Sequence, residues 1–233
     1  MARIGSTFIK EDLVLYIDAA NSKCFKSGDT TCKNLISGGL LTGANGNPGT
    51  GTHTPDPSNF PSYNSDFGGI FDFTGGILGK GMNVEEDLGT STELTICTWL
   101  NTPSTNQQYI SDGRNNGGQW FIANYTGYGV NYTNALRYAP NTDFTNKWAH
   151  MTATSNASGS KLYFNATEVS SYTTQASVDE DLGKNFRIGA RYLTAAGNTQ
   201  YLGYIGLFMI YKRALTPAEI KQNYRTTNRF IVP

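Results

Sequence analysis

Charge is scarce in this sequence, and neither sign is in excess. Charged residues make up 15% of the chain, and 18 Lys and Arg balance 18 Asp and Glu, so the formal net charge is zero. Soluble domains carry roughly 25% charged residues on average. Because nucleic acids and anionic membranes attract basic surfaces, the composition argues against both as partners. The 26 glycines indicate instead a loop-rich β protein with many tight turns.

Long apolar runs are missing as well. The opening MARIGSTFIKEDL lacks the apolar core of a signal peptide. No stretch of about 18 apolar residues could form a membrane-spanning helix. We therefore expect no export signal, no membrane anchor and synthesis in a cytoplasm. A chain of 233 residues can nevertheless bury a large core without help from metals or disulfides.

Cysteine is rare, with Cys24, Cys32 and Cys97 alone. An odd number in a chain without an export signal favours free thiols. Cys24 and Cys32 bracket the polar loop FKSGDTT, which can bring its ends together. A disulfide between Cys24 and Cys32 stays an open alternative if the protein functions outside the cell. Cys97, within the apolar segment TICTW, is expected to be a small buried residue.

Patterns that carry catalysis are also absent. The sequence has no H-x-x-x-H spacing for zinc, no G-x-S-x-G and no P-loop. Its two histidines, His53 and His150, are expected to be structural or surface residues. The acidic runs 85–87 and 179–181 are interpreted as solvated turns. We therefore predict no enzymatic activity.

Short apolar segments separated by turn residues organise the chain. The run 13–17 (LVLYI) predicts a core strand, and 38–66, rich in Gly, Thr, Asn, Pro and Ser, predicts one long surface loop. From Gly68 onward, short strand candidates recur with turn signals between them, which favours an all-β sandwich or barrel. We predict a single domain, residues 1–233, with an N-terminal arm at 1–12 and a tail at 226–233.

One strand running into one capped helix is predicted near the end. Thr216 fits the N-cap, Pro217 the first helical position and Glu219 the third, which together form a capping box before a helix at 217–225. In the preceding strand both faces are apolar, so we expect it to be covered on both sides. Simple alternation would put Tyr204, Phe208 and Ile210 on one face and, on the other, Ile205, Leu207, Met209 and Tyr211.

Several segments, in order, resemble the concanavalin A-like lectin/glucanase superfamily in its laminin-G-like and pentraxin-like branch. They cover most of residues 68–224. The resemblance implies an all-β, two-sheet antiparallel jelly-roll sandwich with one short C-terminal helix, whose ligands bind on the concave sheet or the loops along its edge. The segments are GGIFDFTGGIL, ELTICTWLNT, NKWAHMTATSNASGSKLYFNATEV, FRIGARY and GYIGLFMIYKRALTPAEIKQNY.

A narrower resemblance covers residues 13–39 and is continued by PSYNSDFGGIFDFTG. These segments are similar to the opening of such domains in tailed-phage structural proteins. There Cys32 stands where a Trp is common, which favours its pairing with Cys24. The resemblance implies a non-enzymatic virion protein, made in the host cytoplasm: a capsid decoration, head-fibre or tail-associated component. Its partners would be the capsid or tail lattice, with the arm and the tail as anchoring segments and a homo-oligomer left open.

The chain departs from the family at the positions that carry chemistry. Glucanases of this fold have the carboxylate pattern E-x-D-x-x-E, which supplies a nucleophile and a general acid, and this sequence lacks it. Relatives often place calcium-binding acids where this chain has Gly75, Gly76 and Gly206. Glycine offers Ca²⁺ no carboxylate. We therefore expect no cofactor, and the departure argues against the family's usual calcium site.

A carbohydrate-binding module or adhesin that recognises host-surface glycans is the alternative function. Aromatic and amide residues are dense between 118 and 138. Sugars are commonly held by aromatic faces together with planar hydrogen-bonding groups. A purely structural interpretation, with half of these residues in the core, is also open, and Tyr and Asn serve protein contacts equally well. The candidate contacts for a glycan or a protein partner are Trp120, Asn124, Tyr125, Tyr128, Asn131 and Tyr132.

Overall fold

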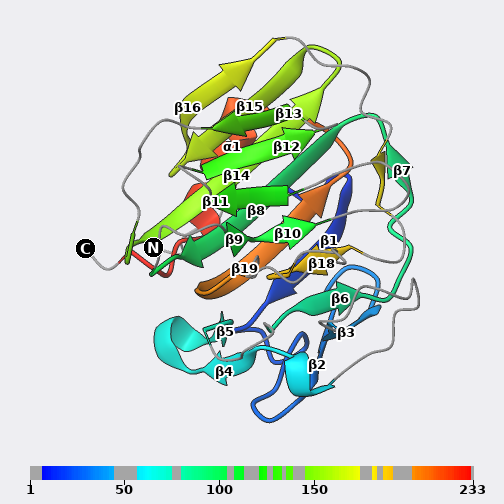
Figure 1. Cartoon of the computed structure of the whole chain (residues 1–233), viewed down its shortest axis with the longest axis vertical. Coiled ribbons are helices and arrows are strands. Elements are labelled where there is room, and N and C mark those ends of the chain that lie inside the picture. The colour runs from blue at the N-terminus through cyan, green and yellow to red at the C-terminus, as the bar shows by residue number, and fades with distance from the viewer. Residues whose placement is uncertain are drawn as a thin grey trace, which may run out of the picture.

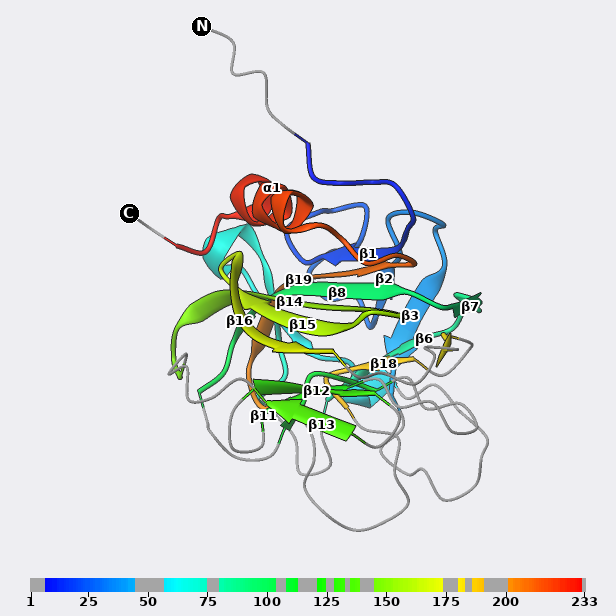
Figure 2. The same ribbon diagram turned by 90° about the horizontal axis from the view of Figure 1, so that it is seen from above.

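Two layers of antiparallel strands carry a single α-helix, α1, on the outside of the larger layer (Figure 1, Figure 2). The computed structural model confirms the predicted two-sheet antiparallel sandwich with one short C-terminal helix. Among the residues described, none of the helical segments combines the length and apolar character that crossing a bilayer requires. The structure describes residues 7–44, 57–74, 80–103, 108–112, 121–124, 128–132, 135–138, 145–173, 180–182, 186–190 and 201–231.

The larger sheet has eight strands in the order β16–β15–β14–β8–β19–β5–β4, and β1 pairs with the part of β19 that β5 leaves free. Its two central strands, β8 and β19, are buried on both faces, as predicted for the apolar run near the end of the chain. The strands are β1 (Leu13–Asp18), β4 (Ser62–Asn64), β5 (Ile70–Asp72), β8 (Leu94–Asn101), β14 (Trp148–Asn156), β15 (Gly159–Phe164), β16 (Thr167–Tyr172) and β19 (Tyr204–Tyr211).

Smaller sheets face the large one from the side opposite α1 (Figure 2). One runs β10–β18–β6–β3–β2, a second runs β13–β12–β11–β9, and β7 pairs with β17. Two 3-10 turns, η1 (Pro57–Asn59) and η2 (Asp66–Gly68), flank β4. The strands are β2 (Thr31–Lys33), β3 (Leu40–Gly43), β6 (Met82–Val84), β7 (Thr90–Ser91), β9 (Gln108–Tyr109), β10 (Ser111–Asp112), β11 (Phe121–Asn124), β12 (Tyr128–Tyr132), β13 (Ala135–Tyr138), β17 (Glu180–Asp181) and β18 (Arg187–Ile188).

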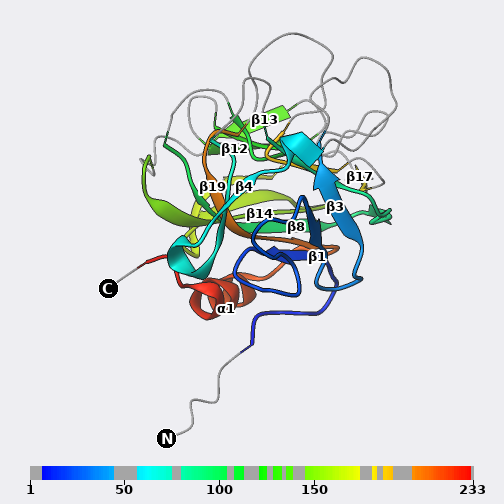
Figure 3. The same ribbon diagram turned by 90° about the horizontal axis from the view of Figure 1, so that it is seen from below.

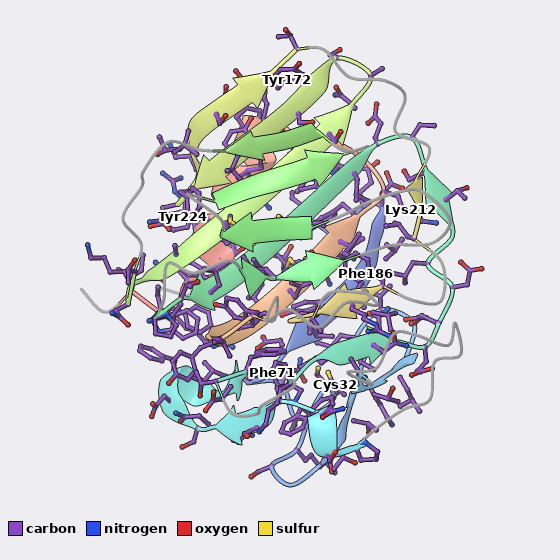
Figure 4. All side chains as sticks on the ribbon, in the orientation of Figure 1. Cys32, Phe71, Tyr172, Phe186, Lys212 and Tyr224 are labelled. Carbon is purple, nitrogen blue, oxygen red and sulfur yellow. The ribbon has the colours of Figure 1, made fainter. Side chains whose placement is uncertain are left out.

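The main hydrophobic core lies between the layers. In strand β1 every second residue is buried and the residues between them are only partly covered, as expected for a strand with one face toward a core. Three aromatic rings from distant segments, Phe25, Phe60 and Phe71, contact one another with centroids 5.3–6.2 Å apart. Phe71 and Phe186 both belong to this core (Figure 4). The burial of many large side chains here is what holds the sandwich together.

A second, smaller core lies on the outer face of the large sheet, beneath α1 (Pro217–Thr227). The predicted capping box is present: the Thr216 hydroxyl accepts from the Glu219 backbone N–H, and the Glu219 carboxylate accepts from the Thr216 backbone N–H. The helix ends two residues later than predicted. Trp99, fully buried on β8, donates its indole N–H to the Thr227 hydroxyl at 2.8 Å and so ties the helix end to the sheet.

Both end segments, as far as they are described, are bound to this outer face. The backbone N–H of Ile9 donates to the Asn223 side chain at 2.9 Å, and the Ile9 carbonyl accepts from the Tyr211 hydroxyl. At the other end, Phe230 is buried and Arg229 forms an ion pair with Asp18 at 2.7 Å. The anchoring role expected for the two ends stays a prediction, and residues 1–6 and 232–233 lie outside the described ranges.

The segment 38–66 is not one long loop, contrary to the expectation from its composition. Strand β3 pairs with both β2 and β6 within it, and β4 pairs with β5. Leu41 and Phe60 are buried in the main core. In the described parts of this segment, 38–44 and 57–66, strands from elsewhere in the chain supply partners for the backbone, a contribution that local composition does not reveal.

Candidate binding surfaces

Four of the six predicted contact residues, Asn124, Tyr128, Asn131 and Tyr132, belong to the four-stranded sheet of β9, β11, β12 and β13. The register places Asn124 opposite Tyr128 and Asn131 opposite Phe121. Tyr132 pairs with Ala135 on β13.

The two remaining predicted contacts, Trp120 and Tyr125, lie outside the described residues. The structure therefore brings Asn124 and Tyr128 together by register and leaves the full set a prediction. This sheet lies on the side of the sandwich away from α1 (Figure 2). We refer below to the part formed by residues 121–124 and 128–132 as the β11–β12 surface.

Cys24 and Cys32 are neighbours in the main core, and the structure holds both as free, buried thiols. A hydrogen bond from thiol to thiol lowers the pKa of Cys24, while burial raises the pKa of Cys32. The pairing predicted from the sequence thus agrees with their proximity, and the bond itself stays a prediction. Cys97 is fully buried, as expected, and burial raises its pKa to about 12.

Oxidation is expected to join Cys24 to Cys32. Oxidised glutathione would accept the two electrons and leave as two thiols, and the closed loop of nine residues (24 to 32) should stabilise the protein by roughly 2.5 kcal/mol. That corresponds to a rise in melting temperature of about 5–10 °C. Thiol titration after unfolding should find one thiol instead of three. Three titratable thiols after oxidation, or an equal gain in stability in the Cys24→Ser variant, would contradict the pairing.

The acidic run 85–87, expected to be a solvated turn, has two of its three carboxylates engaged by neighbouring side chains. Glu86 accepts hydrogen bonds from the side chains of Asn34 and Ser37 at 2.7 and 2.8 Å. Glu85 accepts from Thr42 and Asn83, and only Asp87 is exposed. These carboxylates are engaged by the β2–β3 hairpin. Of the second acidic run, only Glu180 and Asp181 are described, as β17.

His150 is structural, as expected, and His53 lies outside the described residues. The His150 ring is fully buried on β14, 5.3 Å from the Trp99 ring, and its Nε2 has no hydrogen-bond partner. Burial lowers its pKa to about 3. A ring kept neutral and enclosed in this way offers no surface for proton transfer to a ligand.

Position 206 is one of the positions where relatives often carry calcium-binding acids, and packing explains why this chain has a glycine there. The Phe230 ring occupies the space where a side chain would be, only 2.0 Å from a Cβ built at Gly206. Gly75 and Gly76 lie outside the described residues. Within the described ranges, no group of three or more His, Cys, Asp or Glu could hold a metal ion.

Gly206 also marks a β-bulge in β19. The pairing with β8 shifts between Ile205 and Leu207, so Tyr204 and Leu207 both face the outer core although they are three positions apart. Ile205 and Phe208 accordingly share the inner core. The simple alternation expected from the sequence was therefore wrong for the first two residues of this strand.

The bulge completes a line of half-exposed side chains across the outer face. Trp148 on β14 pairs with Asn101 on β8, which pairs with Tyr204 on β19. Tyr204 in turn pairs with Asp72 on β5, and Asp72 pairs with Ser62 on β4. The first four are partly exposed and Ser62 is exposed. We name these five residues the outer-face row; sequence reasoning missed it because its members come from five separate strands.

At one end of this row, two aromatic rings pack against Trp148. Phe230 stacks on Trp148 with centroids 4.4 Å apart, and Phe67 meets Trp148 edge-on at 5.5 Å. Phe67 is 37% exposed and has a left-handed backbone (φ 53°), unusual for a bulky residue. Arg229 holds it there by donating to the Phe67 carbonyl at 3.0 Å. The cyan turn that carries η2 lies beside the C-terminal segment and α1 (Figure 3).

Comparison with protein families gives one extensive match. The family model described as "Concanavalin A-like lectin/glucanases superfamily" (Laminin_G_3) matches residues 76–221, which is more than half of the chain. No curated protein matches the chain significantly.

Many solved structures share the fold at low identity. Domain 4 of AbnA, a GH43 extracellular arabinanase from Geobacillus stearothermophilus in complex with arabinotriose, is 16% identical with a TM-score of 0.62, covering 91% of this chain and 98% of that one. The binding domain of Paraclostridial Mosquitocidal Protein 1 is 18% identical (TM-score 0.59; 91% and 52% covered). Trypanosoma rangeli sialidase in complex with sialic acid is 12% identical (TM-score 0.60; 91% and 32%). This chain thus spans about half of the binding domain and a third of the sialidase.

Proposed function

We propose, from the premise that this chain belongs to the concanavalin A-like lectin/glucanases superfamily, that it is a non-enzymatic carbohydrate-binding module. One observation carries the proposal: the chain covers 98% of a domain whose structure contains arabinotriose, but only 32% of a sialidase. The fold of this chain thus matches, along nearly the whole length of that domain, a structure solved with a bound sugar. Fold alone does not determine function, so the surface chemistry must be tested directly.

The absence of hydrolysis is part of the proposal. The chain lacks the E-x-D-x-x-E pattern anywhere in its sequence. Retaining and inverting glycosidases need two carboxyl groups flanking the scissile bond. Of the acidic residues in the run 85–87, Glu85 and Glu86 are already hydrogen-bonded by neighbouring side chains. A bound sugar should therefore leave the protein unchanged.

Glycan binding is tested with the purified chain on an array of neutral and acidic oligosaccharides. We expect a restricted set of hits, with no shortening of those oligosaccharides after prolonged incubation, measured by mass spectrometry. An array without hits, together with no effect of Trp120→Ala on any binding property, would contradict the proposal. Released shorter sugars would contradict its non-enzymatic part.

A virion structural role is the second candidate, motivated by the phage-like segment 13–39. Part of this segment also supports the fold. Asn34 is buried, accepts from the Tyr16 backbone N–H and donates to the Val14 carbonyl, so it serves as an extra partner for β1. We propose as the setting a virion assembled in a host cytoplasm, with the capsid or tail lattice as partner. Absence of the protein from purified virions by mass spectrometry would exclude this role. The two functions are compatible, because a virion protein can also bind sugars.

A further inference from the structure

We propose that the outer-face row (Trp148, Asn101, Tyr204, Asp72 and Ser62) is the binding site for a short, neutral oligosaccharide. The inference rests on the carbohydrate-binding function proposed above and assigns it a place. That place is the helix-bearing face of the large sheet, on the opposite side of the sandwich from the β11–β12 surface (Figure 2).

Three of the five residues in the row carry unused polar atoms. In the described part of the chain, no hydrogen bond engages the indole N–H of Trp148, the side-chain amide of Asn101 or the hydroxyl of Tyr204. Elsewhere the amides are used: Asn223 both accepts from Ile9 and donates to Tyr211. The row thus offers donors and acceptors that only water or a ligand can satisfy.

Aromatic and planar polar groups alternate along the row, which suits a sugar. The sequence across the strands is Trp, Asn, Tyr, Asp. Ligand sites combine apolar and aromatic surface with a few fixed polar groups. The apolar C–H face of a sugar ring can lie on an aromatic side chain, while its hydroxyls bond to a neighbouring amide or carboxylate. A partner that is purely apolar would leave these polar groups unpaired.

The row is rigid before any ligand arrives. The Tyr201 hydroxyl lies 2.9 Å from the Asn101 carbonyl oxygen and 3.1 Å from that of Tyr204, and it bridges the ends of β8 and β19 from inside. Gly203 is needed there, because a Cβ would lie 2.5 Å from the Asn101 carbonyl. Thr74 donates twice to one oxygen of Asp72 and fixes that carboxylate. Preorganisation of this kind reduces the entropy lost on binding.

The length of the row and the charges along it indicate which class of ligand it fits. Three steps between adjacent strands separate Trp148 from Asp72, a span of roughly 14 Å that a short oligosaccharide fills better than a single sugar. Asp72 contributes one negative charge, and Lys80, bonded to Ser62, contributes one positive charge. Arg229 is neutralised by Asp18 and turned inward. With no net charge along the row, a neutral sugar is favoured over an acidic one.

The test compares matched variants of the full chain on a glycan array and then by calorimetry with the strongest neutral oligosaccharide from that array. Asn101→Ala should weaken binding about tenfold, the equivalent of one or two hydrogen bonds. Tyr204→Phe, which removes a hydroxyl alone, should weaken it by about threefold to tenfold. Tyr172→Phe, at an exposed tyrosine on β16 outside the row (Figure 4), is the matched control and should bind like the parent. Thermal unfolding of each variant checks that the fold is kept.

Three outcomes would overturn the inference. If Asn101→Ala and Tyr204→Phe bind like the parent while Trp120→Ala does not, the glycan binds through the segment 118–138 predicted from the sequence, and the proposed function stands without this site. If acidic sugars alone bind, the charge argument is wrong. If no sugar binds the parent chain, the carbohydrate-binding function itself fails.

Discussion

Acidification from pH 7.5 to pH 4.5 should destabilise the protein by about 2.5 kcal/mol through His150 alone. Burial lowers the pKa of this histidine from 6.5 to about 3. Below pH 6.5 the unfolded chain takes up a proton at this site while the folded protein does not, so the free energy of unfolding falls by about 1.36 kcal/mol per pH unit. The loss continues until about pH 3, where the folded state is protonated as well.

The groups around His150 leave this effect unopposed. The ring contacts Trp99 from β8 and Tyr224 from α1, and its Nδ1 is 3.5 Å from the Thr152 hydroxyl. Cys97, linked to the same hydroxyl, has its pKa raised to about 12 by burial, so it stays neutral throughout. Among the residues that the structure describes, no carboxylate is in contact with the ring to stabilise the imidazolium.

Urea unfolding at several pH values measures the effect, with His150→Asn as the control. The variant should be less stable at pH 7.5 but should lose the part of the pH dependence assigned to His150. His53 is present in both proteins, so its contribution cancels. Equal pH dependence in the two proteins would contradict the assignment.

Trp99→Ala is expected to cost about 4 kcal/mol, since removal of a buried Trp typically costs about 3–5 kcal/mol. The indole is fully buried and contacts Phe230 at 5.2 Å and Tyr224 at 5.6 Å, so it joins the sheet to both the helix and the C-terminal segment. Its loss would leave a cavity beneath α1. The outer face as a whole depends on this residue.

Trp99→Phe separates packing from hydrogen bonding at the same site. It keeps an aromatic ring but removes the bond to Thr227, so we expect a loss of about 1 kcal/mol beyond the change in volume. Both variants are compared with the parent by denaturant unfolding. A Trp99→Ala protein within about 1 kcal/mol of the parent would show that α1 is not held through this residue.

Local signals made the helix predictable, whereas distant contacts decided the rest. The capping box at Thr216 and Glu219 depends on four consecutive residues and was correct. Gly206 could be interpreted from the sequence only as a missing carboxylate. Its structural reasons, the bulge and the Phe230 ring, involve a partner strand and a residue 24 positions later.

The two candidate sites differ in the same respect: one could be identified from neighbouring residues in the sequence, and the other could not. Residues 118–138 could be selected because their aromatic and amide side chains are close in sequence. The outer-face row could not, because Asp72, Asn101, Trp148 and Tyr204 meet only through the register of four strands. A one-residue error at the bulge would have turned Tyr204 to the inner face.

The three tryptophans provide the most direct measurement of the central claim. Their indole N–H signals in an NMR spectrum report separately on the helix interface (Trp99), the segment predicted from the sequence (Trp120) and the outer-face row (Trp148). During titration with the strongest neutral oligosaccharide from the array, the Trp148 signal should move in a saturable manner while the Trp99 signal stays fixed. A shift of the Trp120 signal alone, or no shift of any of the three, would contradict the account.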